Sequence, residues 1–466
     1  MSGYIHEPAR DVPVIGEYEV VVVGGGPAGL MAATAASRAG RSTLLVERYG
    51  FLGGAGTMGG LATFCGLHAR VHGEDRRVIR GFTDELLDRL DVLDGLSVPH
   101  LSVYDRIMAQ AYDISAYKIV ADDLVLSGGG ELLFHAAAVG VSLRDGATGP
   151  GAAPGTASGN EIDAVIVESK SGRGAIRGQV FIDGSGDGDL AAWSGAPFEV
   201  SEQLLYPSLM FRINGVDPVR AGEAWKTVAR LMEEAEEAGT HGFPRKKPIV
   251  RPQRNPLEWR SNLTQLSNDD GSPVDGTDVG QLTHGEIQGR RQVRETFDFI
   301  KTVTPGFEDA YIVDIAPQVG IRETRRIVGS YQVTEEDILG CADFSDTVGV
   351  NGWPVEAHVA GTVEFRFPPV ESRGFNQLPF RMIVPQGVDN LYVVGRCASM
   401  TQGGQSSARV TGPCFAMGQA AGTAADLALS ARVPVGAVDV SALQQRLARD
   451  GAYLGTAASQ QPVGVR

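Results

Sequence analysis

The sequence predicts an α/β protein: a Rossmann-like domain with a parallel central sheet and a small antiparallel meander, plus an inserted α+β domain. A run of valines, a glycine-rich turn and an alanine-rich segment follow one another from Tyr18 to Gly40. This order of apolar strand, glycine and alanine-rich helix returns after Val384. At 466 residues, the chain exceeds one ordinary hydrophobic core. The expected parts are a discontinuous Rossmann-like domain (1–200 and 385–455), a substrate or cap domain (201–384) and a disordered tail (456–466).

The stretch from Tyr18 to Glu47 has the pattern of a dinucleotide-binding βαβ unit. Val20 to Val23 are β-branched and suit a strand that is buried on both faces of a parallel sheet. An alanine-rich helix is expected over residues 30–39, and a short apolar strand over residues 42–46 follows it. The unit ends on an acid, Glu47, about 20 residues beyond the glycine turn, where it can accept hydrogen bonds from ribose hydroxyls.

Three glycines between the first strand and the helix have the G-x-G-x-x-G spacing: Gly24, Gly26 and Gly29. The first allows a tight turn, the second lets a pyrophosphate approach the backbone, and the third lets helix and strand pack closely. The free N–H groups and the dipole at the start of the helix favour a phosphate there. A turn of purely structural origin is the alternative. The strand, the helix and the acid around the glycines favour a dinucleotide site.

The loop after Glu47 has the glycine-rich sequence RYGFLGGAGTMGG. Glycine permits backbone conformations that most residues cannot adopt. Such a loop suits contact with a ring system or a second phosphate, and the alternative is a mobile surface loop. Its position directly after the acid favours a contact with the cofactor.

Apolar periodicity and composition predict the elements up to residue 200. They are helices at 81–93 and 113–126 and strands at 131–143, 162–169 and 178–182. Residues 145–160 are mostly glycine, alanine, proline and serine and predict a flexible hairpin tip. The strands around this tip form an antiparallel meander, which ends on the sequence DGSGDGD from Asp183 to Asp189.

The second half of the chain contains longer polar segments before the first texture returns. The expected strands are 209–214, 311–315, 321–333 and 390–394, and the expected helices are 218–238, 280–302, 414–429 and 438–449. On the strand expected at 321–333, Arg322 and Arg326 share one face, so they and Arg325 do not all face one pocket.

The composition excludes several classes of function. A net charge of −15, with one basic cluster at Arg245 to Arg254, argues against a nucleic-acid partner. The cysteines are far apart and form no C-x-x-C, so neither a disulfide framework, a metal site nor an iron–sulfur cluster is expected: Cys65, Cys341, Cys397 and Cys414. No apolar run approaches the ~20 residues that span a bilayer, and the N-terminus lacks a signal core. We therefore expect no membrane insertion and a cytoplasmic location.

Several phrases together resemble the FAD-dependent oxidoreductase family of the glutathione-reductase-like flavin fold, which is distantly related to succinate dehydrogenase flavoproteins. They are VVVGGGPAGLMAA, GGAGT, VFIDGSGDGDLAAWSGA, IRETRRIVGSY, NLYVVGRCAS and GPCFAMGQAAGTAA. The resemblance covers nearly the whole chain. It implies a Rossmann-like FAD-binding domain and FAD as the cofactor.

The resemblance also implies roles for three later segments. The segment IDGSGDGDL shapes the adenosine and pyrophosphate pocket, and VVGR touches the ribityl chain and pyrophosphate. The helix with MGQAAG aims its N-terminus at the flavin pyrimidine, where its dipole stabilises the charge of the reduced ring. Related flavoproteins often carry an acid where Arg396 stands, so a phosphate oxygen is the alternative partner of this residue.

The expected FAD-binding residues come from the motifs and the resemblance together. They are Gly24, Gly26, Pro27, Ala28, Gly29, Glu47, Arg48, Gly53, Gly54, Thr57, Asp183, Gly184, Ser185, Gly186, Gly395, Arg396, Gly418 and Gln419.

Three residues are candidates for orienting the substrate or moving its proton. His68 follows the glycine loop and is expected to face the flavin ring, and His358 lies in the second domain. Arg381, just before the third flavin segment, suits a substrate carboxylate. The alternatives are a core or surface role for each histidine and a structural ion pair for the arginine. Covalent flavin attachment at His68, His72 or Cys65 is not favoured, because no attachment motif is present.

The leading hypothesis is a dehydrogenase or oxidase that exchanges a hydride between FAD and a small polar organic substrate, bound between the FAD domain and the cap. No second nucleotide-binding pattern follows residue 60, and Cys65 has no partner for disulfide reductase chemistry. One alternative is an NAD(P)H-dependent flavin monooxygenase, against which Arg396 counts. The other is an electron-transfer subunit, which the lack of a cysteine cluster weakens. The electron acceptor, whether oxygen, quinone or a carrier protein, stays open.

Overall fold

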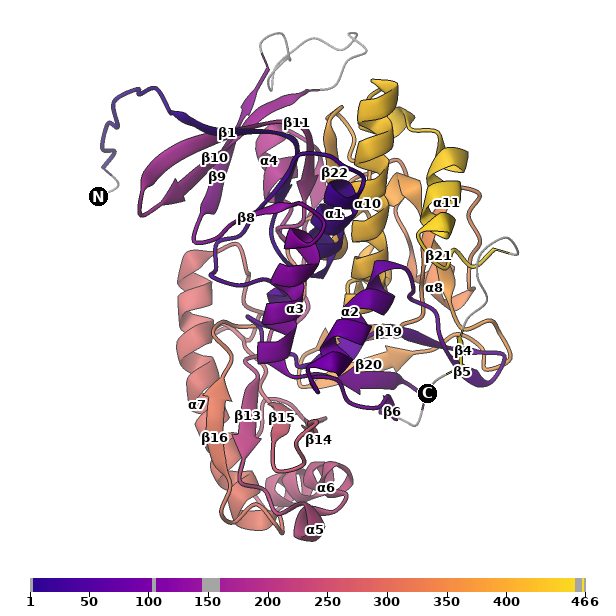
Figure 1. Ribbon diagram of the computed structural model, residues 1–466. Coiled ribbons are helices and arrows are strands. Elements are labelled where there is room, and N and C mark those ends of the chain that lie inside the picture. The colour runs from indigo at the N-terminus through magenta and orange to yellow at the C-terminus, as the bar shows by residue number, and fades with distance from the viewer. Residues whose placement is uncertain (1–2, 103–105, 145–159, 457–462, 465–466) are drawn as a thin grey trace.

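The computed structural model describes residues 3–102, 106–144, 160–456 and 463–464 (Figure 1). The expected hairpin tip therefore lies outside the described residues, apart from residue 160. Most of the expected disordered tail lies outside them too. The described part of that tail, β23 (Val463–Gly464), pairs with β5 (Glu74–Arg77).

A seven-stranded sheet forms the centre of the molecule and confirms the predicted α/β class. Its order is β8-β2-β1-β11-β10-β9, and β22 pairs with β11. The pairs around β1, together with β11–β22, are parallel, whereas β9, β10 and β11 form an antiparallel meander. The bounds are β1 (Val14–Val23), β2 (Thr43–Val46), β8 (Glu131–Leu133), β9 (Ala137–Leu143), β10 (Ile162–Ser169), β11 (Gly172–Asp183) and β22 (Leu391–Val393).

The valine run of β1 is buried on both faces, as its composition predicts. Val20 and Val22 lie in the largest hydrophobic core, which contains the helices of one face. Val21 and Val23 lie in the core on the opposite face, under the meander. Register alternation therefore divides the run between two layers.

Two helices pack side by side against one face of the sheet, α1 (Pro27–Arg38) and α10 (Thr411–Ala431), as Figure 1 shows. Both begin earlier than the sequence predicts, at Pro27 instead of residue 30 and at Thr411 instead of residue 414. Pro27 opens α1 because proline has no N–H to leave unpaired in a first turn. The same face carries α3 (Ile114–Leu126), which Asp113 caps.

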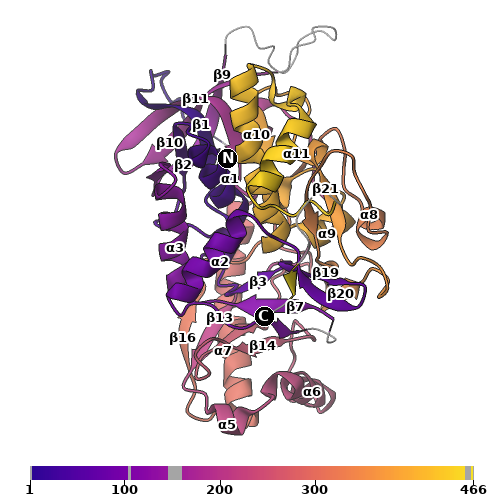
Figure 2. The same ribbon diagram turned by 45° about the vertical axis from the view of Figure 1, so that its right-hand side comes forward.

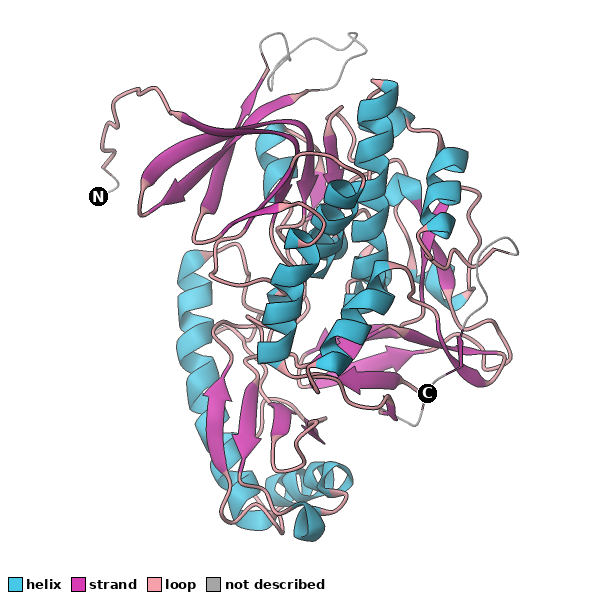
Figure 3. Cartoon of the chain, viewed as in Figure 1, coloured by secondary structure: helices cyan, strands magenta, loops and turns pink. Residues whose placement is uncertain are grey.

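A second layer of structure projects from this body (Figures 2 and 3). It contains an antiparallel sheet of order β14-β15-β13-β16, packed on a long helix, α7 (Val279–Val303). The strands are β13 (Phe211–Asn214), β14 (Ile249–Pro252), β15 (Trp259–Asn262) and β16 (Tyr311–Ile315). Residues between Leu209 and Val319 form a hydrophobic core of their own. The division of the chain at residues 201 and 384 stays a prediction.

Some elements differ from their predicted form. The strand expected at 131–143 is two strands, and the helix expected at 218–238 breaks at Gly222, whose φ of +47° favours glycine. The strand expected at 321–333 is a loop apart from β17 (Arg326–Ile327). The two helices on either side of the break are α5 (Pro218–Ala221) and α6 (Ala224–Glu237).

The remaining elements cover the ends and edges of the body. They are β3 (Thr63–Cys65), β4 (His68–Val71), α2 (Phe82–Val92), β6 (His100–Leu101), β7 (Met108–Ala111), α4 (Asp189–Ser194), β12 (Phe198–Glu199), α8 (Glu335–Leu339), β18 (Thr347–Asn351), β19 (Val355–Val359), β20 (Thr362–Arg366), β21 (Asn376–Pro379), α9 (Gln402–Ala408) and α11 (Val440–Arg449). Among the described residues, no helix has the length and apolarity needed to cross a membrane.

Candidate active site

A cavity of about 360 Å³ lies at the carboxyl ends of β1, β11 and β22. Residues from both ends of the chain and from the projecting layer line it together. Thirteen of the predicted site residues are among them: Gly24, Gly26, Pro27, Ala28, Glu47, Arg48, Gly54, Gly184, Ser185, Gly186, His358, Gly395 and Arg396. The carboxyl ends of parallel strands are where open α/β sheets bind ligands.

The glycine turn is shaped by close backbone contacts. Gly24 has a φ of +94°, and a Cβ there would lie 2.4 Å from the carbonyl oxygen of Gly184. A Cβ at Gly29 would lie 1.8 Å from the carbonyl oxygen of Gly24. Gly29 therefore packs the helix against the turn and does not itself line the cavity.

The first turn of α1 faces the cavity without a negative charge of its own. Gly26, Pro27 and Ala28 line the cavity. The N-cap, Gly26, makes no side-chain hydrogen bond, and the first turn contains no acidic residue. The N–H groups at this helix start are therefore available to an anion.

Glu47 is 7% exposed and held in place by two backbone donors. The N–H of Gly25 donates to Oε2 at 2.7 Å, and the N–H of Tyr49 donates to Oε1 at 3.0 Å. A carboxylate has further lone pairs, so Glu47 can still accept hydrogen bonds from two hydroxyl groups.

The loop after Glu47 divides its predicted residues between the cavity and the loop interior. Arg48 and Gly54 line the cavity, whereas Gly53 and Thr57 do not. The Thr57 hydroxyl donates to the carbonyl oxygen of Leu52 at 2.7 Å, so this residue holds the loop in shape.

Asp183 ends β11 and supports the turn that follows. It is fully buried, and its Oδ1 accepts from the N–H and the hydroxyl of Ser185 at 3.0 and 2.6 Å. Burial and the charge of Asp189 raise the pKa of Asp183 to about 6. Asp183 therefore acts on the cavity through Gly184, Ser185 and Gly186, which line it.

Arg396 reaches the cavity from the loop after β22. Its Nη2 donates to Oδ1 of Asp187 at 2.7 Å. Its Nη1 is buried and has no hydrogen-bond partner among the residues that the structure describes. An anionic oxygen of a bound cofactor would satisfy this donor.

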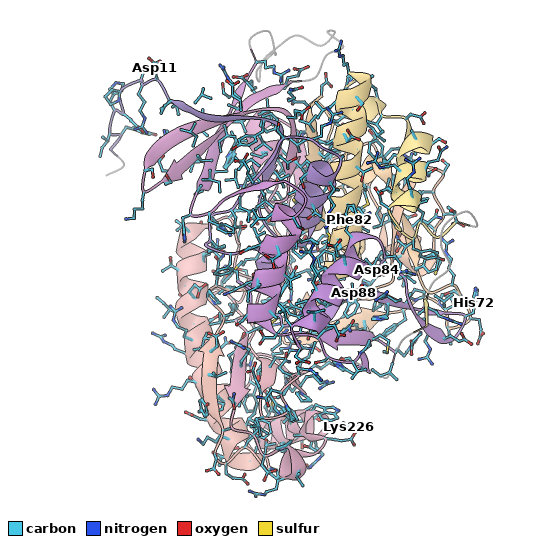
Figure 4. The ribbon with its side chains drawn as sticks, viewed as in Figure 1. Asp11, His72, Phe82, Asp84, Asp88 and Lys226 are labelled. Carbon is cyan, nitrogen blue, oxygen red and sulfur yellow. The ribbon has the colours of Figure 1, made fainter. Side chains whose placement is uncertain are left out.

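The start of α10 points at the cavity, but Gly418 and Gln419 do not. Thr411 and Cys414 line the cavity. Gly418 packs against α1, because a Cβ there would lie 2.0 Å from the carbonyl oxygen of Ala28. Gln419 accepts a hydrogen bond from the N–H of Phe82, at the start of α2 (Figure 4), at 3.1 Å. The true first turn of the helix lies further towards the N-terminus than the motif suggests.

His358 lies in the cavity wall, paired with Glu356. Its Nε2 lies 3.0 Å from Oε1 of Glu356, and Trp353 Nε1 donates to Oε2 at 2.8 Å. Burial and the charge of Arg322 hold the pKa of His358 well below its ordinary range, against the opposing effect of Glu356. Burial alone would raise the pKa of Glu356, but the hydrogen bond from His358 and neighbouring positive charges outweigh it and lower it. The pair is therefore a neutral imidazole on an ionised carboxylate.

The other two catalytic candidates lie outside the residues that line the cavity. His68 is 5% exposed, and burial together with the charge of Arg77 lowers its pKa to about 4. Arg381 is 46% exposed at its side chain and pairs with Asp346, whose Oδ2 lies 2.9 Å from Nε. His72 lies on the outer hairpin of β4 and β5 (Figure 4), and its ring lies 3.0 Å from the carbonyl oxygen of Glu371. Cys65 does line the cavity.

Sequence reasoning missed two arginines in the cavity wall, Arg260 and Arg409. Arg260 lies in β15, and Arg409 lies between α9 and α10. Arg322, which the sequence places on a shared face with Arg326, also lines the cavity. The one available signal for Arg260 was a charged residue inside an otherwise buried strand segment.

A family model for FAD dependent oxidoreductases matches residues 19–447. The chain belongs to the FAD-dependent oxidoreductase family. FAD is therefore the cofactor, and the glycine turn, the free start of α1, Glu47 and the unpaired donor of Arg396 fit its adenosine diphosphate half.

Solved structures similar to this FAD-dependent oxidoreductase include three flavoenzyme-type proteins. One is a geranylgeranyl bacteriochlorophyll reductase-like protein from Thermoplasma acidophilum, with 12% identity over 96% of this chain and 93% of that chain and a TM-score of 0.44. Another is p-nitrophenol 4-monooxygenase from Pseudomonas putida DLL-E4, with 13% identity, 95% and 87% coverage and a TM-score of 0.46. The third is aklavinone-11 hydroxylase in complex with FAD and aklavinone, with 16% identity, 89% and 63% coverage and a TM-score of 0.42. No curated protein matches the sequence.

Proposed function

We propose that this protein is a dehydrogenase or oxidase that exchanges a hydride between FAD and a small polar organic substrate. One observation carries the proposal. The cavity that begins at Gly24 and Glu47 continues to a wall of polar and charged side chains, which includes Arg260, Glu356 and His358. The wall combines β15 of the projecting sheet with β19 of the main body. A substrate in this part of the cavity lies between the cofactor-binding loops and the projecting layer.

The chain holds FAD with residues from three segments. The start of α1 and the turn from Gly184 to Gly186 bind phosphate oxygens, and Glu47 accepts from ribose hydroxyls. Arg396 supplies a donor from the third segment. When bound, FAD supplies the acceptor for the hydride.

His358 is the residue that we assign to the substrate proton. With Nε2–H donating to Glu356, the lone pair of the neutral ring is at Nδ1, which takes up the proton. Glu356 fixes this tautomer and stabilises the imidazolium that proton uptake creates. Burial excludes water from the pair and strengthens this interaction.

The test is anaerobic reduction of the purified holoenzyme by a panel of metabolites, followed as loss of the oxidised flavin band. We expect one or more small polar compounds to bleach the flavin. The H358Q variant should retain FAD and slow the reduction by about 10²- to 10⁴-fold, the usual contribution of a general base. H72Q, on the outer hairpin, is the matched control and should leave the rate unchanged.

Three outcomes would contradict the proposal. Colourless protein that FAD does not reconstitute would remove the cofactor site. An unchanged reduction rate in H358Q would remove the proton acceptor. Rapid bleaching by NADPH, with oxygen incorporated into a product, would indicate the monooxygenase alternative.

A further inference from the structure

We infer that the substrate is an organic monocarboxylate with an apolar body, and that Arg260 and Arg409 bind its carboxylate. This inference rests on the proposed function, because it assigns the substrate class of the same site. Three features of the cavity carry it: unpaired guanidinium groups, a carboxylate that is already engaged, and an apolar wall beside them.

The guanidinium groups of Arg260 and Arg409 lack charged partners. Both residues line the cavity, and the Nε atom of each is buried without a hydrogen-bond partner among the described residues. Arg409 Nη2 makes one long contact, 3.4 Å, with the carbonyl oxygen of Glu356. Within the described part of the chain, no carboxylate forms an ion pair with either side chain. A buried charge without a partner is costly, so the site is complete only with an anion.

A third arginine adds positive charge without adding an acceptor. Arg322 lines the same cavity and donates to the carbonyl oxygen of Tyr206 at 2.8 Å and to the hydroxyl of Ser208 at 2.7 Å. Both of these acceptors are neutral. Its charge therefore also remains uncompensated at this wall.

The carboxylate of Glu356 does not replace the missing anion. One of its oxygens bonds to His358 and the other to Trp353. Both Glu356 and the two arginines act on the pKa of Cys65, which places these groups around one part of the cavity. Three guanidinium groups thus share that part with one engaged carboxylate.

An apolar wall lies next to the arginines. Ile107, Trp353 and Val410 form a small hydrophobic cluster, and Cys65 and Phe365 pack against it. All five line the cavity, and Val410 directly follows Arg409. A ligand with one carboxylate and an apolar remainder matches this arrangement, because a second charged group would be desolvated against the wall.

The phosphates of FAD do not explain this charge. The start of α1 and the turn after β11 provide the phosphate-binding donors at the carboxyl end of the central sheet. Arg260 instead lies in the projecting sheet, and the cluster around Trp353 lies in a separate hydrophobic core. The arginines therefore serve a second anion.

The test measures binding to the oxidised, FAD-loaded holoenzyme and needs no turnover. Benzoate and propionate are compared with their neutral isosteres, benzamide and propionamide, by the change in the flavin absorption spectrum and by thermal shift. We expect each acid to bind at least about tenfold more tightly than its amide, and benzoate to bind more tightly than propionate.

Variants locate the effect. R260Q and R409Q should each weaken benzoate binding by at least about tenfold and leave benzamide binding unchanged, whereas R260K should keep part of the affinity. The control is R294Q, on the exposed face of α7, where the side chain of Arg294 is 84% exposed. The comparison of acid and amide in the unmodified protein stands even if one variant does not fold.

Binding of the amides as tightly as the acids would overturn the inference, and so would the absence of binding by both acids. If neutral compounds reduce the flavin and the acids do not bind, the inference fails and the proposed function stands. If the acids bind as expected and no compound reduces the flavin, the proposed function fails and the anion site stands.

Discussion

The carboxylate of Glu47 is oriented before any ligand arrives, because two backbone N–H groups hold it at 2.7 and 3.0 Å. Its remaining lone pairs face the cavity that the glycine turn also lines. A buried acceptor that is fixed in this way discriminates between a ligand with paired hydroxyls and one without them.

The first prediction concerns this residue. E47Q keeps the size of the side chain but replaces one acceptor oxygen by an NH₂ group, which faces N–H or hydroxyl donors. We expect FAD affinity to fall by about 10- to 100-fold, which corresponds to about 1.4 to 3 kcal/mol. Titration of the apoprotein with FAD, followed by flavin fluorescence, measures this change. Glu168, which pairs with Arg173 on the exposed end of the meander, provides the control E168Q. Equal affinity in E47Q and the parent would contradict the role.

The second prediction concerns His68 and acid. Its pKa is about 4 in the folded chain and about 6.5 in the unfolded chain, so between these values only the unfolded chain binds the proton. The free energy of unfolding should therefore fall as the pH falls from 6.5 towards 4, by up to about 3 kcal/mol from this residue. Urea unfolding at pH 7 and pH 5 measures the slope.

The H68Q variant should show a shallower dependence on pH than the parent, because the group that takes up the proton is gone. H72Q, on the outer hairpin, should keep the parental slope. Identical slopes in H68Q and the parent would show that other groups govern the acid sensitivity.

The predictability of site residues depends on how far apart in the chain their partners lie. Gly24, Gly26 and Glu47 belong to one contiguous βαβ unit, and their spacing alone predicted their place in the cavity. Arg260 and Arg409 carry no comparable local pattern, because their place depends on how the projecting sheet meets the end of α9. Arg381 seemed well placed by chain position, but its pairing with Asp346 turns it outward.

At the scale of elements, the contact between α1 and α10 decides the geometry of the cavity. Gly418 and Gly422 face the carbonyl oxygens of Ala28 and Ala32, where a Cβ would lie at 2.0 and 2.2 Å. The two helices therefore approach each other through backbone. This approach brings Thr411 and Cys414, in the first turn of α10, to the cavity.

The third prediction tests this contact. Alanine favours a helix over glycine by about 1 kcal/mol, so G418A would stabilise an isolated helix. In this protein we expect the opposite, a loss of at least about 2 kcal/mol together with weaker FAD retention, because the Cβ forces the helices apart. Thermal unfolding and the ratio of FAD to protein measure the two effects. The control is G140A in β9, where a Cβ meets nothing within 4 Å. Parental stability in G418A would contradict the close packing.

Elements with a clear period were predictable, and those stabilised by buried polar groups were not. Periodicity located α2, α3, α7 and β16 within two residues. The segment from Arg322 to Arg326 alternates like a strand, but its side chains are buried in a polar network. Glu323 accepts from the hydroxyl of Ser201 at 2.6 Å and the N–H of Leu205 at 2.9 Å, and it also pairs with Arg326. These long-range contacts hold the segment as a loop.

At the scale of the whole molecule, the cavity joins parts of the chain that are distant in sequence. Gly24, Gly184, Arg260 and Arg396 all line it. A ligand that fills such a cavity binds the folded chain and not the unfolded chain, so it stabilises the fold by mass action.

The fourth prediction is that removal of FAD lowers the unfolding temperature. At a free FAD concentration 100 times the dissociation constant, the cofactor contributes about 2.7 kcal/mol. Thermal unfolding of the apoprotein, the holoenzyme and the reconstituted protein measures this, and reconstitution should recover the holoenzyme value. Riboflavin lacks the adenosine diphosphate and serves as the control, with a smaller effect. Equal unfolding temperatures with and without FAD would contradict a shared site.

The order of strands in the central sheet has a consequence for how the protein is made. The end of β11 is flanked by β1, from the first residues of the chain, and by β22, from the last quarter of it. During translation, the last residues of β11 therefore wait with one edge unpaired until Leu391 to Val393 leave the ribosome. A nonsense mutation before these residues leaves a nascent product with an open strand edge and without Arg396, so it is prone to aggregate and incompletely equipped for cofactor capture.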